Sequence, residues 1–365
     1  MRNMWFKELM GFLENDINPD QVRSSMQLSS TTAGILTSAH SNRRFQCGTL
    51  TIPSLGELRH QVDTIPENKR LPGRIQLSQI VANVQQLHLD PVNAGATFQV
   101  ASQFNLLEMA SPDAVPEDGV GIYGSDQTQG PACAVACGAG TIYRNYYVPI
   151  LLEAAATVGG GGGGGGGDGQ QIGQTAARQI DCLQDLGRAL GNDDTNKLWT
   201  MKNGYALATL EGLESIERRL AIATSTAQER DALLQLVRIG IQSDTQVTLH
   251  DCRHTVTQVY CSALPVRYGD HAAYKWQAFA RLILEACYEA TFHAAVLNAA
   301  KTGNRRVYLT LVGGGVFGNE IVWILEAMER TLRLFRNVAL DVRIVSHKRS
   351  NPSVQELVDK YSQEQ

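Results

Sequence analysis

The chain has 365 residues, of which 43% are hydrophobic and 19% are charged, and its formal net charge is −4. This composition is typical of a globular protein that can bury a sizeable core. The slight negative charge, with no basic run longer than two residues, argues against nucleic-acid binding. No stretch is long and apolar enough to span a membrane, and the N-terminus lacks a secretory signal, so we expect a cytoplasmic protein.

Taken in chain order, the expected elements alternate between helices and strands. Before a run of nine glycines at 159–167, we expect helices at 4–14, 19–27, 77–87 and 131–148, and strands at 48–52 and 97–102. After it, we expect helices at 175–190, 203–224, 227–236, 276–301 and 320–335, strands at 246–250, 258–263, 307–312 and 338–345, and a short helix after Pro352. This alternation predicts an α/β fold, a three-layer sandwich around a mixed central sheet, with extra N-terminal helices.

The glycine run sets the expected domain organisation. No regular element tolerates so much backbone entropy, so we expect a disordered insertion near residues 157–171. The segments on either side look like parts of one alternation, which favours an insertion within a single domain. We therefore expect an N-terminal helical extension at 1–44, one domain at 45–350 and a C-terminal tail at 351–365.

The most informative segment is 307–319, VYLTLVGGGVFGN. Its first part is an apolar strand, its glycines break that strand, and a helix follows. A strand, a glycine-rich turn and a helix N-terminus together present backbone N–H groups and a positive helix end to an anion. The alternative is a tight turn that binds nothing.

Two further polar junctions adjoin expected elements: residues 101–105 after a strand, and residues 127–131 at the start of a helix. In an open α/β sheet, ligands bind where such junctions meet at the carboxyl ends of strands. No GxxxxGK[ST] motif is present, and the first strand–helix turn lacks GxGxxG. These absences argue against an ATP-hydrolysing P-loop and a nicotinamide-dependent dehydrogenase.

Residues 115–130, VPEDGVGIYGSDQTQG, form an acidic loop that leads into a helix and carries Glu117, Asp118 and Asp126. Carboxylates beside a phosphate–sugar site can activate water, stabilise an oxocarbenium-like sugar or protonate a leaving group. The alternative interpretation is a solvated turn in which Asp126 assists a helix N-terminus.

The cysteines and histidines of the sequence do not form a complete set of metal ligands. The seven scattered cysteines include no Cys-X-X-Cys pair, which favours reduced thiols over a disulfide framework. Cys133 and Cys137 lie four residues apart, but no nearby His or Cys pair completes a site. His250 and His254 share a face only on a helix, whereas this segment is expected to end a strand. We therefore predict no metal site.

Together the loops resemble the macrodomain superfamily of ADP-ribose-binding proteins. Residues 315–318, GVFG, are similar to the superfamily's second phosphate loop, and in 98–108, FQVASQFNLLE, Asn105 is the nearest match to its asparagine. The usual NAAN sequence and glycine-rich first loop are absent. The combination of FQVASQFNLLE, PEDG, DQTQGPACAVACG, YRNY and GGGVFGN resembles the divergent branch around the bacterial effector MavL. Members of that branch release ADP-ribose from arginine, notably on ubiquitin.

The resemblance, which covers about residues 45–148 and 256–345, implies an ADP-ribosyl-arginine hydrolase. On this hypothesis Asp118 and Asp126, with Glu117 as a further candidate, hold the guanidinium, orient water and stabilise the developing positive charge on the ribose. The implied ligand-binding residues are Gln103, Phe104, Asn105, Gln129, Gly130, Gly313, Gly314, Gly315, Val316, Phe317, Gly318 and Asn319.

The expected partner is ADP-ribose or an ADP-ribosylated protein, with ubiquitin as the implied target, rather than a nucleic acid or a membrane. The scheme requires no metal or cofactor, although a magnesium-dependent variant stays open. Two alternatives also stay open: a module that binds ADP-ribose without cleaving it, and a hydrolase of another ADP-ribose linkage.

Overall fold

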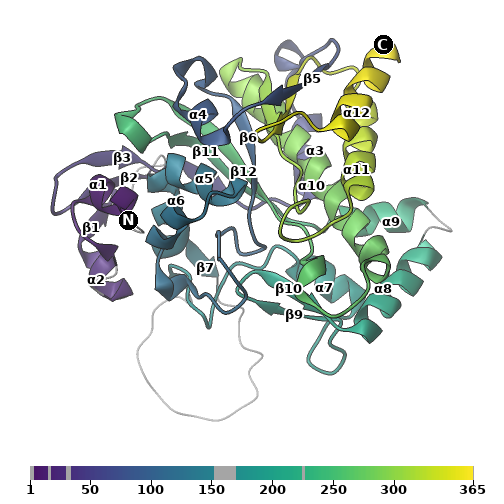
Figure 1. Ribbon diagram of the computed structural model, residues 1–365, viewed down its shortest axis with the longest axis horizontal. Helices are drawn as coiled ribbons and strands as arrows, with labels where there is room; N and C mark the ends of the chain where they lie inside the picture. Colours follow the sequence, from purple (N-terminus) through teal and green to yellow (C-terminus); the bar gives the residue numbers. More distant parts are fainter. Residues whose placement is uncertain (1–3, 15–17, 30–33, 152–169, 224–226, 365) are drawn as a thin grey trace.

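The computed structural model describes residues 4–14, 18–29, 34–151, 170–223 and 227–364 (Figure 1). Most of the glycine-rich insertion predicted near 157–171 lies outside these ranges. No helix among the described residues is both long enough and apolar enough to cross a membrane.

A seven-stranded mixed sheet forms the centre of the molecule. Its strands, in spatial order, are β4 (Thr49–Thr51), β11 (Gly240–Gln246), β12 (Thr255–Cys261), β6 (Thr97–Ala101), β13 (Arg306–Leu309), β14 (Asp341–Ser346) and β5 (Gln76–Val81). Neighbours from β12 to β5 pair in parallel, whereas β4 and β11 pair antiparallel at one edge. Because parallel strands end at the same edge, the loops that follow β6, β12 and β13 meet there.

Helices cover both faces of the sheet (Figure 1). The helices are α1 (Met4–Met10), α2 (Pro19–Ser24), α3 (Leu55–Asp63), α4 (Val84–Leu89), α5 (Gln129–Ala136), α6 (Gly138–Tyr146), α7 (Gln184–Leu190), α8 (Leu210–Ala223), α9 (Ala227–Leu234), α10 (Ala273–Thr302), α11 (Ile321–Leu334) and α12 (Pro352–Gln363). On β12, Thr257 donates a hydrogen bond to Asn298 of α10, whereas the next residue, Gln258, donates one to Cys133 of α5. Successive strand residues point to opposite faces, so α5 and α10 lie on opposite sides of the sheet.

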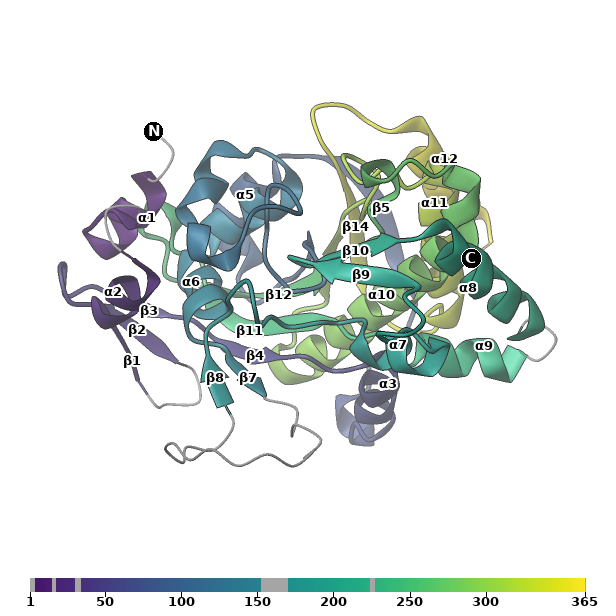
Figure 2. The same cartoon turned by 90° about the horizontal axis from the view of Figure 1, so that it is seen from below.

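The N-terminal residues form more than helices. Besides α1 and α2 they build a three-stranded antiparallel sheet from β1 (Met26–Leu28), β2 (Ile35–Ser38) and β3 (Arg44–Gln46). These elements gather at one end of the molecule (Figure 2) and share a hydrophobic core with α5 and α6. The buried Glu14 accepts hydrogen bonds from the backbone of Val120 and Gly121 and from the Tyr146 hydroxyl. The N-terminal segment therefore holds the acidic loop in place.

Several predicted elements are confirmed with shifted bounds. The strands at 97–102 and 338–345 correspond to β6 and β14, and the helices at 276–301 and 320–335 correspond to α10 and α11. The strand predicted at 307–312 ends earlier, as β13. The helix predicted after Pro352 is α12, and its buried residues Val354, Leu357 and Tyr361 pack into the main core.

Other predictions are wrong because tertiary pairing overrides a local pattern. The helical spacing at 77–87 spans strand β5 and helix α4, since β5 pairs with β14 along its whole length. Residues 203–224 begin with β10 (Tyr205–Ala208), which forms a hairpin with β9 (Trp199–Lys202) before α8 starts. In 175–190, only α7 is helical. Of the strand predicted at 246–250, only Gln246 lies in a strand, as the last residue of β11, and Leu249–Asp251 form a 3₁₀ turn with a positive φ at His250.

Candidate functional site

A cleft of about 250 Å³ opens where the loops after β6, β12 and β13 meet the first turn of α5. It continues into a groove of about 730 Å³ that reaches the ends of β5 and β14. The residues common to the cleft and the groove are Asp126, Thr128, Gln129, Thr310 and Gly315. A concave site at the carboxyl ends of parallel strands is where α/β proteins commonly bind ligands.

The glycine turn after β13 forms one wall of the cleft, through Gly313, Gly315, Val316 and Phe317. The glycines of this turn differ in their backbone conformation and in the space around them. Gly313 and Gly318 have φ of 74° and 73°, and a Cβ on either would lie within 2.4 Å of another side chain. A Cβ on Gly315 would meet nothing within 4 Å. The first two therefore shape the turn, and Gly315 leaves its backbone open to the cleft.

Phe317 belongs to an aromatic wall that it forms with Tyr205 of β10 and with Tyr268 of the 3₁₀ turn η7 (Val266–Tyr268). The centroids of these rings lie 5.2–5.5 Å apart, and all three residues line the cleft. The Tyr205 hydroxyl donates a 2.7 Å hydrogen bond to the Met109 carbonyl, which fixes its ring. Such a wall can pack against a sugar or a base. Neither tyrosine was predicted as a site residue, because only the tertiary fold brings them to Phe317.

Asp126 and the start of α5 also line the cleft. Asp126 Oδ1 accepts a 2.8 Å hydrogen bond from the backbone of Thr128, just before the helix. The side chain of Gln129 pairs with the backbone of β6: it accepts a hydrogen bond from the Ala101 N–H and donates one to the Gln99 carbonyl. A Cβ on Gly130 would lie 2.0 Å from the Ala101 carbonyl oxygen, so only glycine lets α5 approach β6 this closely. Asp126 thus lines the same cleft as the glycine turn.

The other two predicted carboxylates lie outside this cleft. Glu117 accepts two hydrogen bonds from the backbone of Ala176, at 3.0 and 2.9 Å. Asp118 Oδ2 accepts from the Val115 N–H at 2.9 Å, which closes the 3₁₀ turn η4 (Pro116–Asp118). Both side chains hold backbone amides in an exposed turn. The structure therefore brings Asp126, but neither Glu117 nor Asp118, to the glycine turn.

Of the predicted site residues after β6, one lines the cleft and two are buried away from it. Gln103 lines the cleft, and its amide group pairs with both backbone groups of Met109. Phe104 is buried in the main core. The buried Asn105 accepts from the Leu107 N–H and donates to Gln179. Phe104 and Asn105 therefore shape the loop, whereas Gln103 contributes to the cleft surface.

Three predicted residues of the glycine turn do not line the cleft: Gly314, Gly318 and Asn319. Asn319 is buried and donates a 2.8 Å hydrogen bond to the Leu264 carbonyl. It thereby ties the end of the turn to the loop after β12.

Glu108 also lines the cleft and was not among the predicted site residues. The loop after β6 turns back through Leu106, whose φ of 64° is unusual for a branched residue, and this reversal buries Glu108 to 3% exposure. Within the part of the chain that the structure describes, neither carboxyl oxygen of Glu108 has a hydrogen-bond partner. Burial raises the pKa of Glu108 to about 8; the positive charge of Arg144 opposes this shift and the negative charge of Asp126 adds to it. A glutamate inside the apolar run FNLLE was the available sequence signal.

The structure offers little for a metal ion. Over the described ranges there is no group of three or more His, Cys, Asp or Glu side chains that could hold one. Cys133 and Cys137 are buried between the sheet and α5, where burial raises the pKa of both thiols above the usual value.

Comparisons with known proteins give only distant matches. No family model matches the chain, and no curated relative matches its sequence. Among solved structures, it is similar to poly(ADP-ribose) glycohydrolase from Thermomonospora curvata (TM-score 0.42, 11% identity, 99% of this chain and 98% of that chain covered). It is also similar to poly(ADP-ribose) glycohydrolase from Deinococcus radiodurans in complex with ADP-ribose (TM-score 0.43, 9% identity, 84% and 91% covered).

Proposed function

We propose that this protein is an ADP-ribosylhydrolase that cleaves the N-glycosidic bond between ADP-ribose and an arginine of a modified protein, with ubiquitin as the implied target. The observation that carries the proposal is the meeting of Asp126 and the glycine turn in one cleft. A hydrolase of this kind needs an anion-binding turn for the diphosphate and a carboxylate at the reacting sugar. The motifs that resemble macrodomains suggest ADP-ribose as the ligand, and the cleft contains both the glycine turn and a carboxylate.

In this proposal the diphosphate lies against the backbone of Gly313–Phe317, and the positive N-terminus of α5 faces it. The aromatic wall of Tyr205, Tyr268 and Phe317 packs against a ribose. Asp126 stands at the ribose carbon that bonds to arginine. One of its oxygens is held by Thr128, so the other is left to orient water and to stabilise positive charge on the ribose.

A panel of substrates tests the proposal. The purified chain is incubated with ubiquitin ADP-ribosylated on arginine, and with proteins that carry the modification on serine or glutamate. We expect chromatography to show free ADP-ribose from the arginine-linked substrate alone. Release from another linkage only would replace the arginine assignment, and binding without release would identify a non-catalytic ADP-ribose-binding module. An absence of both binding and release would contradict the proposal.

Gly315→Leu tests the binding half of the proposal. A Cβ at this position meets no atom within 4 Å, and its φ is not positive, so the fold should tolerate a side chain there. We expect the affinity for ADP-ribose, measured by calorimetry, to fall roughly tenfold or more, with an unchanged melting temperature.

Gly318→Ala is the comparison variant, three residues further along the same turn. Its positive φ and its contact with Arg267 make the substitution destabilising, by about 1 kcal/mol for the backbone conformation alone. Unchanged ADP-ribose affinity in Gly315→Leu would place the diphosphate elsewhere.

A further inference from the structure

Glu108 is a buried carboxyl group, unpartnered within the described ranges, that lies in the wall of the cleft. Its side chain is almost wholly buried, and its carboxyl oxygens have no hydrogen-bond partner among the described residues, although it lines the cleft that Asp126 also lines. An unpartnered carboxyl group costs free energy when buried, especially in its charged form. Glu108 therefore lacks, in the described chain, the hydrogen-bond partner that a substrate group bound beside it in the cleft would supply.

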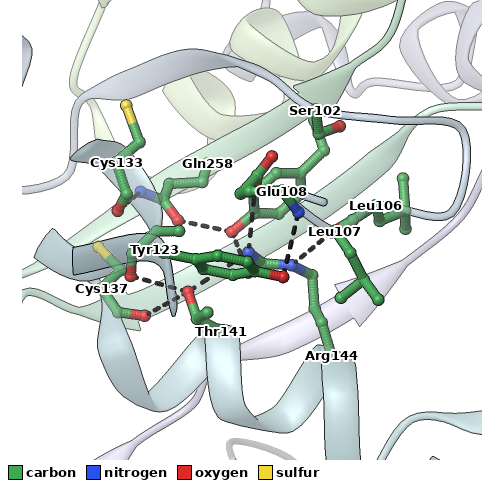
Figure 3. Close-up of polar contacts among 12 residues, drawn as sticks. Ser102, Leu106, Leu107, Glu108, Tyr123, Cys133, Cys137, Thr141, Arg144 and Gln258 are labelled. Atoms are coloured by element: carbon green, nitrogen blue, oxygen red, sulfur yellow. Dashed lines mark hydrogen bonds and ion pairs between the residues drawn. The ribbon is translucent and has the colours of Figure 1, made fainter. Parts of the chain in front are cut away.

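Arg144 lies next to Glu108 but does not hold it as a tight ion pair (Figure 3). The closest approach, Arg144 Nη2 to Glu108 Oε1, is 3.8 Å, which is too long for a hydrogen bond. The guanidinium instead donates to the Leu106 carbonyl at 2.9 Å and to the Tyr260 hydroxyl, and it lies 3.8 Å from the centre of the Tyr260 ring. Arg144 is thus satisfied without an ionised Glu108, and it fixes the loop that carries Glu108.

The surroundings of Glu108 contain few charges. The titratable or charged groups that face it are Arg144 from α6, Asp126 from the loop before α5, Cys133 from α5, Tyr123 from the 3₁₀ turn η5 (Gly121–Ser125), Tyr205 from β10 and Tyr260 from β12. Arg144 favours the ionised form, whereas Asp126 and burial oppose it. Such an environment favours the neutral form of the Glu108 carboxyl group.

We propose that Glu108 is a second catalytic residue of this cleft, a neutral carboxylic acid that gives its proton to the leaving nitrogen; this role rests on the proposed hydrolase function. As the bond between the ribose carbon and the nitrogen breaks, its electron pair moves to the nitrogen. Glu108 protonates that nitrogen and becomes a carboxylate. Water attacks the ribose carbon and loses a proton to Asp126. Solvent then returns a proton to Glu108 and removes one from Asp126.

The direction of the proton transfer follows from relative basicity. A free guanidine accepts a proton with a pKa above about 12, whereas the pKa of Glu108 is about 8. The proton therefore moves downhill once the nitrogen holds the electron pair, and the product leaves as a stable guanidinium. Near neutral pH Glu108 still carries the proton that this step requires.

Glu108→Gln is the first test, because it preserves shape and neutrality but cannot transfer a proton. We expect kcat for arginine-linked substrate to fall about 100-fold or more, with ADP-ribose affinity changed less than threefold. Wild-type kcat should decrease as the pH rises through about 8, where Glu108 loses its proton, and the residual activity of the variant should lack this decrease. Glu67→Gln, an exposed glutamate outside the cleft, is the matched control.

A substrate with a better leaving group separates catalysis from a structural role. ADP-ribose linked to para-nitrophenol releases a phenolate that needs no proton. We expect Glu108→Gln to hydrolyse this compound at a rate close to that of the wild type. Equal losses on both substrates would indicate a positional role for Glu108 and overturn the inference.

The ionisation of Glu108 can be measured without any turnover. In the full-length wild-type protein, carbon NMR of labelled glutamate side chains should show one carboxyl group, assigned with Glu108→Gln, that titrates near pH 8. A titration near pH 4.5, the ordinary value for glutamate, would overturn the inference even if hydrolysis occurs. A titration near pH 8 in a protein that hydrolyses nothing would instead contradict the proposed function.

Discussion

Asp126→Asn is expected to lower the rate of ADP-ribose release from arginine by about 100-fold or more, with little change in ADP-ribose affinity. The amide keeps the size of the side chain and can still accept from the Thr128 N–H, so the start of α5 should be preserved. It loses the negative charge that orients water and stabilises the ribose cation. Single-turnover release and calorimetry measure the two effects separately.

Two further variants make this test specific. Asp63→Asn changes an exposed acid at the end of α3, outside the cleft, and controls for the loss of one negative charge. Asp118→Asn compares the two aspartates of the acidic loop. Because Asp118 closes an exposed turn, we expect this variant to lose less of the hydrolysis rate than Asp126→Asn does. A larger loss in Asp118→Asn, with the fold intact, would mean that Asp118 reaches the substrate. Full activity in Asp126→Asn would contradict the site assignment.

Glu289→Leu is expected to have the largest effect on stability, with a loss of about 3 kcal/mol or more in the free energy of unfolding. Glu289 lies in the middle of α10 and is 3% exposed. It accepts hydrogen bonds of 2.6 Å from both Arg59 and Arg330, which come from α3 and α11. Its loss removes the buried carboxylate that Arg59 and Arg330 share, although Arg59 keeps its ion pair with Asp231 and Arg330 its ion pair with Glu285. The contact between the three helices is weakened. Urea denaturation at neutral pH measures the loss.

The same residue predicts the acid sensitivity of the fold. Burial opposes ionisation of Glu289, but hydrogen bonds from His293, Arg59 and Arg330 outweigh it and lower the pKa to about 2. A carboxyl group with a lowered pKa stabilises the native state fully above its unfolded value of 4.5, and this contribution is lost as the pH falls from 4.5 towards 2. The difference in stability between wild type and Glu289→Leu should therefore shrink over this range.

Glu326→Gln is the control, because Glu326 joins the same two helices, α10 and α11, through an ion pair with Arg281 that is more exposed to solvent than Glu289 is. We expect it to cost less than about 1 kcal/mol. Equal losses in Glu326→Gln and Glu289→Leu would mean that burial does not strengthen the Glu289 cluster.

Local sequence patterns predicted the helices and strands in which buried residues recur at the spacing of that element. The long apolar helix 276–301 and the strand at 97–102 were found because their patterns reflect contacts made on the helix and in the sheet. Strand β5 was missed because its spacing also fits a helix, and only its pairing with β14 decides between the two. Strand β9 lay outside every predicted element, and β10, with Tyr205, fell within the helix predicted at 203–224.

The candidate site was partly predictable. The glycine turn and Asp126 carry local signals, namely glycines after a strand and an acid before a helix. Glu108 carries a weaker signal, because its importance depends on the reversal at Leu106 that buries it beside the cleft. The positions of Glu117 and Asp118 depended on backbone amides that no side-chain pattern reveals.

The most direct test of the account is a crystal structure of the protein with ADP-ribose bound. We predict that the diphosphate contacts the backbone of Gly313–Phe317 and that the reacting ribose carbon lies between Asp126 and Glu108. A ligand bound outside this cleft, or one whose reacting ribose points away from both carboxyl groups, would contradict the account.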